Sequence, residues 1–118
     1  MGHLSTHVLD TTNGCPAVGM AVKLQRRNGS DFETIADFDL NVDGRYEGGA
    51  LLDGTSIAAG CYRLVFSVAP YFKARGIELP DPPFINDVLL DFGIANPTDR
   101  YHVPLLVSPW AYSTYRGS

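Results

Sequence analysis

Apolar and polar residues alternate along several short segments of the chain, a pattern typical of half-buried β-strands. The clearest segment is residues 101–108, where every odd-numbered side chain is apolar or aromatic. The even-numbered positions place His102 among Pro104, Leu106 and Ser108. The odd face is therefore expected to join a core. The even face carries an imidazole among apolar and small residues, so we expect something to cover it.

A second alternating segment opens the chain. Over residues 3–10, Leu4 and Val8 belong to one face and His7 to the other. Since the apolar face packs inward, His7 is expected to point away from the core, as His102 does. His3 precedes the first core position, and we expect it to belong to a frayed terminus.

Glycine-containing turn pairs divide the rest of the chain into strand-sized pieces. A short helix is expected over residues 69–75, because Pro70 lies near its first turn and Gly76 follows its last. The pattern predicts one all-β domain, residues 1–118, with seven or eight strands in a sandwich or barrel. Besides the two segments above, the expected strands cover residues 21–27, 32–39, 46–52, 61–68, 84–92 and 110–115.

The composition is that of an ordinary globular protein, with 45% apolar and 19% charged residues. No apolar run is long enough to span a membrane. The net charge of -4 and the scattered basic residues argue against a nucleic-acid partner. Cys15 and Cys61 are too few for a disulfide framework, so free thiols are expected. Without a recognisable targeting signal, the expected location is cytoplasmic.

Three residues are suited to handling protons and anions together: His7, His102 and Arg45. A histidine can take a proton from water near neutral pH. An arginine can hold a planar anion or a developing oxyanion. For each residue taken alone, a surface or interface role with a single hydrogen bond is the favoured interpretation. The histidines have no carboxylate or thiol at supporting spacing, and no phosphate loop is present, so we expect neither a metal nor another cofactor.

Four segments, spread over nearly the whole chain, are distinctive when taken together. They are LSTHVLD at residues 4–10, DGR at 43–45, YHVPLLVSP at 101–109 and YRGS at 115–118. In this order they resemble the 5-hydroxyisourate hydrolase family of transthyretin-like proteins. The terminal tetrapeptide distinguishes these hydrolases from transthyretin, the hormone carrier that shares their fold.

The resemblance implies a transthyretin/prealbumin-like sandwich of two sheets, with about eight strands and one short helix. It also implies a homotetramer with paired sites between dimers. Because apolar faces of that size are uncommon on a monomer, we expect the side of the last two strands that carries Leu106, Trp110 and Tyr112 to be buried between subunits. The implied reaction is hydrolysis of 5-hydroxyisourate, a small molecule of urate breakdown, by histidine-assisted attack of water on a ring carbonyl. The matching motifs give catalytic roles to His7, Arg45, His102 and Ser118, and substrate contacts to Ser108, Tyr115, Arg116 and Gly117.

The chain departs from the family pattern at Arg100, where many members have another histidine. It also carries Trp110 where tyrosine is usual, and a bulky Tyr46. Two other interpretations are a non-catalytic carrier of a small aromatic ligand and a purely structural sandwich. A carrier has no use for two histidines and an arginine in its channel, so the hydrolase is favoured.

Overall fold

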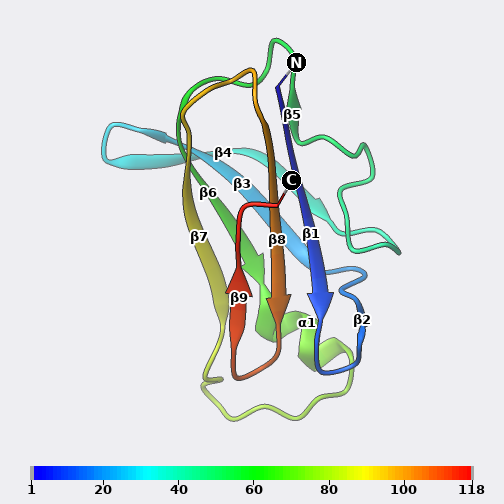
Figure 1. The fold of residues 1–118 in the computed structure, drawn as a ribbon. Helices are drawn as coiled ribbons and strands as arrows, with labels where there is room; N and C mark the ends of the chain where they lie inside the picture. The colour runs from blue at the N-terminus through cyan, green and yellow to red at the C-terminus, as the bar shows by residue number, and fades with distance from the viewer. Residues whose placement is uncertain (1, 118) are drawn as a thin grey trace.

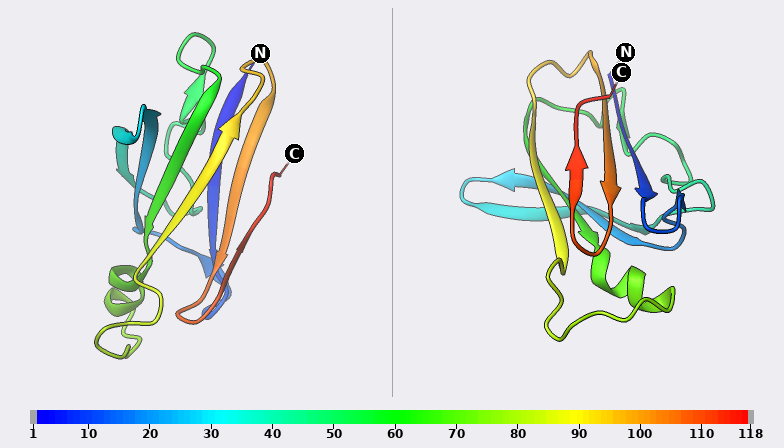
Figure 2. Two further views of the ribbon diagram at one scale, coloured as in Figure 1. Left: turned by 90° about the vertical axis from the view of Figure 1, so that its left-hand side faces the viewer. Right: turned by 60° about the horizontal axis from the view of Figure 1, so that its bottom comes forward.

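Two β-sheets packed face to face form the structure, a computed structural model that describes residues 2–117 (Figures 1 and 2). Ser118 lies outside the described residues, so its catalytic role stays a prediction. Within residues 2–117 there are nine strands and one helix, and two of the strands have only two residues. The strands are β1 His3–Asp10, β2 Cys15–Pro16, β3 Ala21–Asn28, β4 Asp31–Asp39, β5 Leu52–Asp53, β6 Gly60–Ser67, β7 Asp87–Ile94, β8 Arg100–Val107 and β9 Tyr112–Thr114; the helix is α1 Val68–Ala74.

The first sheet has the order β2-β1-β8-β9, with β5 also paired to β1, and the second has the order β4-β3-β6-β7. Neighbouring strands run antiparallel except β1 and β8, which are parallel and in register from His3 opposite Arg100 to Asp10 opposite Val107. This pair joins the two ends of the chain side by side (Figure 1). The predicted all-β sandwich is confirmed.

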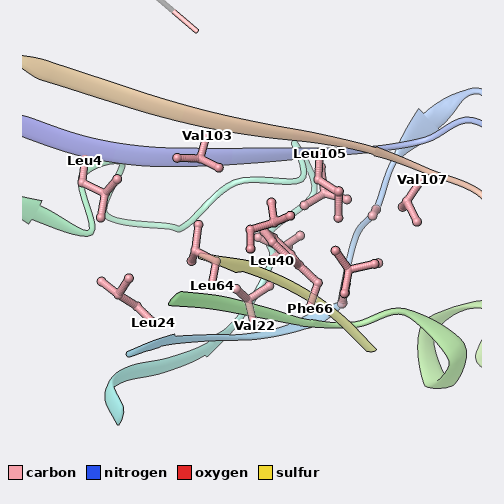
Figure 3. Packing of buried hydrophobic residues seen from close by; sticks show 14 of the residues in the cluster. Leu4, Val22, Leu24, Leu40, Leu64, Phe66, Val103, Leu105 and Val107 are labelled. Atoms are coloured by element: carbon pink, nitrogen blue, oxygen red, sulfur yellow. The ribbon is translucent and has the colours of Figure 1, made fainter. Parts of the chain in front are cut away.

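The core lies between the sheets, where the inward side chains of both meet (Figure 3). The odd face of β8 is buried, as its alternation predicts. Each leucine or valine that is fully buried there contributes on the order of 1.5–3 kcal/mol. Residues labelled in Figure 3 include Leu4, Val103, Leu105 and Val107 from the first sheet and Val22, Leu24, Leu64 and Phe66 from the second.

The strand expected over residues 46–52 is wrong except at its last residue, because the chain turns there instead. The backbone N–H of Gly49 donates to the carbonyl of Tyr46 at 2.8 Å, and Gly49 has a φ of 83°. A positive φ favours glycine and ends an extended segment. Only Leu52 of this range belongs to a strand, the short β5.

Two further expected strands begin later than predicted. The strand expected from residue 84 begins at Asp87, because the carbonyl of Asn86 accepts from the N–H of Ala69 in α1. The last strand begins at Tyr112, since the Ser108 hydroxyl accepts from two backbone N–H groups in the preceding turn. Side-chain and helix contacts thus set both boundaries.

The helix α1 occurs where it was expected, one residue earlier at each end. The chain leaves it through Gly76, which has a φ of 82°.

No helix within residues 2–117 is long and apolar enough to cross a membrane. Cys15 is half-buried and Cys61 exposed, and both are free thiols, as predicted.

Candidate active site

Histidine, serine and arginine side chains gather on the outer face of the β1–β8 pair. Residues in register on neighbouring strands share a face, and β1 places His3 opposite Arg100 and Ser5 opposite His102. His7 follows on the same face of β1, since side chains alternate. The outward orientation predicted for His7 and His102 is confirmed, because the inward neighbours of both are buried.

Arg45 reaches this face from the loop between β4 and β5. Its backbone forms an isolated antiparallel bridge with His7, and the N–H of Val8 donates to the Gly44 carbonyl at 3.0 Å. Gly44 has a φ of 72°, and a Cβ there would lie 2.6 Å from the carbonyl oxygen of Val8. Only glycine therefore allows the loop to lie this close to β1. The Asp43-Gly44 turn sets Arg45 beside His7.

The ring of His102 is held on two sides. Its Nδ1 is 2.7 Å from the Oγ of Ser5, a hydrogen bond whose direction depends on the tautomer. On another side lies Gly117, whose N–H donates to the His102 carbonyl at 2.7 Å. A Cβ on Gly117 would stand 2.7 Å from the ring Cδ2 of His102. These contacts fix the imidazole and leave no room for a larger residue at position 117.

Burial and nearby positive charge act on both histidines. Burial lowers the pKa of His102, and the charges of Arg45, His7 and His3 lower it further. Burial and Arg45 also lower the pKa of His7, against a smaller opposite effect of Asp43. Both imidazoles are therefore biased toward the neutral form, which is the form that accepts a proton.

A cavity of about 300 Å³ opens beside His102, at the small end of the range for ligand sites. Two arginine side chains, Arg45 and Arg100, supply its positive charge. Its lining consists of His3, Ser5, Arg45, Arg100, Tyr101 and His102. The cavity thus brings two of the predicted catalytic residues together, Arg45 and His102, while His7 adjoins it through Arg45.

A larger cavity of about 580 Å³ lies between β8 and the edge strands β7 and β9. Its lining is mainly apolar and contains Tyr115 and Arg116 but none of the histidines. Arg116 stacks over the Tyr101 ring at 4.2 Å from its centroid and donates to the Arg100 carbonyl at 2.9 Å. The structure therefore places Tyr115 and Arg116 beside the candidate site rather than in the histidine cavity, and their substrate contacts stay predictions.

Ser108 is the one described site candidate that lies far from the others. It follows β8, six residues beyond His102, which is roughly 20 Å along an extended chain. Its hydroxyl accepts from the backbone N–H groups of Trp110 and Ala111. Within a single chain the structure does not bring Ser108 to the histidines, so its substrate contact also stays a prediction.

Sequence reasoning did not name four lining residues of the cavity as site residues: His3, Ser5, Arg100 and Tyr101. His3 was expected to fray, but it begins β1, pairs with Arg100 and Asp53, and lines the cavity. Ser5 contacts His102 directly. The alternation that placed His7 outward applies equally to His3 and Ser5, so this signal was present in the sequence. Among residues 2–117, no group of three potential metal ligands converges.

Comparison with known proteins identifies the chain's relatives. The model of the HIUase/Transthyretin family matches residues 4–117. The chain belongs to this family. The 5-hydroxyisourate hydrolase of Pseudomonas aeruginosa is 50% identical over 118 residues, which cover all of this chain and 93% of that protein.

Solved structures of HIUase/Transthyretin relatives share the fold. The 5-hydroxyisourate hydrolase of Klebsiella pneumoniae is similar with a TM-score of 0.82 and 35% identity, covering both chains completely. The (S)-allantoin synthase structure is similar with a TM-score of 0.93 and 47% identity over 99% of this chain. The match spans only 44% of the synthase chain, so this protein corresponds to less than half of that enzyme.

Proposed function

We propose that this protein hydrolyses 5-hydroxyisourate to 2-oxo-4-hydroxy-4-carboxy-5-ureidoimidazoline. The observation that carries the proposal is the meeting of Arg45 and His102 at one small cavity, with His7 bridged to Arg45. The family membership and the names of its hydrolase relatives support the same reaction.

The reaction needs a base for water and a group that holds the anion. A neutral histidine accepts the proton as water attacks the ring carbonyl, and the same proton can then pass to the departing ring nitrogen. The lowered pKa values of His7 and His102 keep them neutral at pH 7. Positioned proton transfer of this kind accelerates a reaction roughly 10²- to 10⁴-fold.

Arg45 has the complementary role. Its guanidinium binds the anionic substrate ring and the oxyanion that forms when water adds to the carbonyl. Its charge also disfavours protonation of both histidines. One residue thus attracts the substrate and helps to keep the base in its active form.

We further propose that the active protein is a homotetramer with sites between dimers. Large apolar side chains remain exposed on the single chain, among them Leu89, Trp110 and Tyr112, and closed symmetry buries such surfaces. Sedimentation equilibrium at micromolar concentration measures the mass. A tetramer is expected, and a monomer would contradict the proposal.

We also expect the protein to act in the cytoplasm, where its two free thiols would remain reduced. Fractionation of the cells that produce it, with detection by antibody, tests this location. Recovery in the culture medium or in an oxidising compartment would count against it.

The reaction is tested spectroscopically with 5-hydroxyisourate generated in place from urate, after subtraction of its spontaneous decay. We expect the protein to accelerate loss of the intermediate, with or without a chelator. Binding of a small aromatic ligand without turnover would instead indicate a carrier. Loss of activity with the chelator would indicate a metal-dependent hydrolase.

A further inference from the structure

The cavity contains a second arginine that the proposed reaction does not use. Arg100 enters from the start of β8, whereas Arg45 enters from the loop on the other side of β1. Among residues 2–117, none that lines the cavity is acidic. In a chain of net charge -4, this concentration of positive charge favours an anionic ligand.

The surroundings of Arg100 fix its backbone. Its carbonyl accepts from Arg116 at 2.9 Å, and it pairs in register with His3 on β1. Within residues 2–117, its guanidinium takes part in no hydrogen bond or ion pair. The nearby acids Asp53 and Asp99 do not line the cavity. A fixed backbone and an arginine fork at a cavity wall make a suitable anion site.

We propose that Arg100, with His3 beside it, binds the carboxylate that forms when the substrate ring opens. This rests on the proposed function. Water forms a new bond from its oxygen to the carbonyl carbon, and the bond from that carbon to the ring nitrogen breaks. One proton of water passes to the nitrogen and the other leaves the new carboxylic acid. The product therefore carries a carboxylate that the substrate lacks.

Two arginines suit this change. Arg45 binds the ring beside His7, and Arg100 binds the new carboxylate at the end of the β1–β8 face where His3 lies. Arginine recognises carboxylates through two parallel hydrogen bonds, which a lone histidine cannot provide. Arg100 therefore makes this site selective for ring compounds that carry a carboxylate.

The test uses two stable probes and does not depend on turnover. Orotate is a planar cyclic ureide with a carboxylate, and uracil is the same ring without it. Calorimetry at constant ionic strength measures both ligands on the wild-type protein, Arg100→Gln, His3→Asn and the control Arg27→Gln. Arg27 is a suitable control because it lies on β3, where it donates to the Gly29 carbonyl, away from the cavity.

We expect Arg100→Gln to weaken orotate binding about tenfold, the low end for a charge-assisted hydrogen bond, and to leave uracil binding unchanged. His3→Asn should have a smaller effect of the same kind, and Arg27→Gln none. Equal affinity of orotate for wild type and Arg100→Gln would overturn the proposal, as would a wild-type protein that does not bind orotate.

Turnover of 5-hydroxyisourate, measured on the same variants, separates this inference from the proposed function. Suppose that the wild-type protein binds orotate through Arg100 but does not accelerate hydrolysis. This result would support the anion site and contradict the proposed reaction. If Arg100→Gln slows turnover without changing orotate affinity, Arg100 acts through another group. That result would also overturn the carboxylate site.

Discussion

The inner face of β1 ends in Asp10, whereas the outer face of the same strand carries His3, Ser5 and His7. Asp10 is completely buried, and its carboxylate accepts hydrogen bonds from Tyr71 and from the backbone and side chain of Asn13. The histidines are half-buried beside a cavity that gathers positive charge. Asp10 has its partners within the chain, and the histidine face has room for a ligand.

The pKa values of Asp10 and His102 also differ in whether partners within the chain offset the effect of burial. Burial alone would raise the pKa of Asp10, but the hydrogen bonds from Asn13 and Tyr71 outweigh it and lower that pKa. Nothing comparable offsets the burial of His102, whose positive neighbours add to the effect. A satisfied buried charge contributes to stability, whereas groups held away from their preferred charge state are typical of functional sites.

The largest effect is expected from the outer face. His7→Asn and His102→Asn should each lower kcat at least about 10²-fold, because each removes a proton acceptor. Arg45→Lys should lose most activity as well, since an ammonium keeps the charge but not the planar fork. Turnover is measured together with thermal unfolding, and the unfolding temperature should be nearly unchanged. Near-normal kcat in a folded histidine variant would make that residue an interface residue only.

Substitutions at Asp10 and Tyr71, on the inner side of β1, should lower stability and leave kcat unchanged. Asp10→Asn leaves amide hydrogens facing the donors of Asn13 and Tyr71, and we expect it to lower the free energy of unfolding by about 2–3 kcal/mol. Tyr71→Phe removes one of these hydrogen bonds and should cost about 1–2 kcal/mol. Urea unfolding measures both variants. The kcat per folded molecule should stay at the wild-type value, and a large loss of kcat would show that the two faces are coupled.

The sequence predicted which way the side chains of β1 and β8 point better than it predicted which residues they contact. The outward direction of His7 and His102 followed from local alternation. Contact between Ser5 and His102, which are 97 residues apart, depends on the parallel register of β1 and β8, and no local pattern fixes that register. The approach of Arg45 depends on the close fit of Gly44 against β1. The pairing of strands that are distant in the sequence can be read only from the structure. The same is true of positions, such as Gly44, where close packing allows only glycine.

A smaller effect is expected at Arg116, whose guanidinium holds Tyr101 and the Arg100 carbonyl. Arg116 directly precedes Gly117, which lies against the His102 ring, so we expect Arg116 to act as a positioning residue. Arg116→Gln should lower kcat about tenfold. A 1 Å misplacement of reacting groups can lower the rate roughly 10²-fold. The expected loss is smaller because Gly117 keeps its hydrogen bond to the His102 carbonyl. Arg116→Lys should restore part of kcat, and Arg27→Gln should leave it unchanged. A rise in KM alone would instead support direct substrate contact by Arg116.

The smallest effect is the dependence of stability on pH. The histidines of the outer face and Asp10 of the inner face should lose their contributions to stability in different pH ranges. The pKa values of His7 and His102 are lowered from 6.5, so near and below pH 6.5 the unfolded chain binds more protons than the folded protein. Their contribution to stability is present above pH 6.5 and is lost as pH falls through the lowered values. Asp10, with its pKa lowered from 3.8, loses its contribution only on further acidification, below pH 3.8.

Urea unfolding from pH 8 down to about pH 2 measures both windows. His7→Asn should flatten the upper part of the stability profile and leave the lower part, and Asp10→Asn should do the reverse. The rate of hydrolysis should follow the upper window alone, rising with pH to a plateau whose midpoint lies below 6.5, because only the neutral histidine accepts a proton. A midpoint above 6.5 would mean that the bound substrate or a partner subunit stabilises the charged imidazole. In that case burial and the positive charge of Arg45 would no longer determine the protonation state of the histidines.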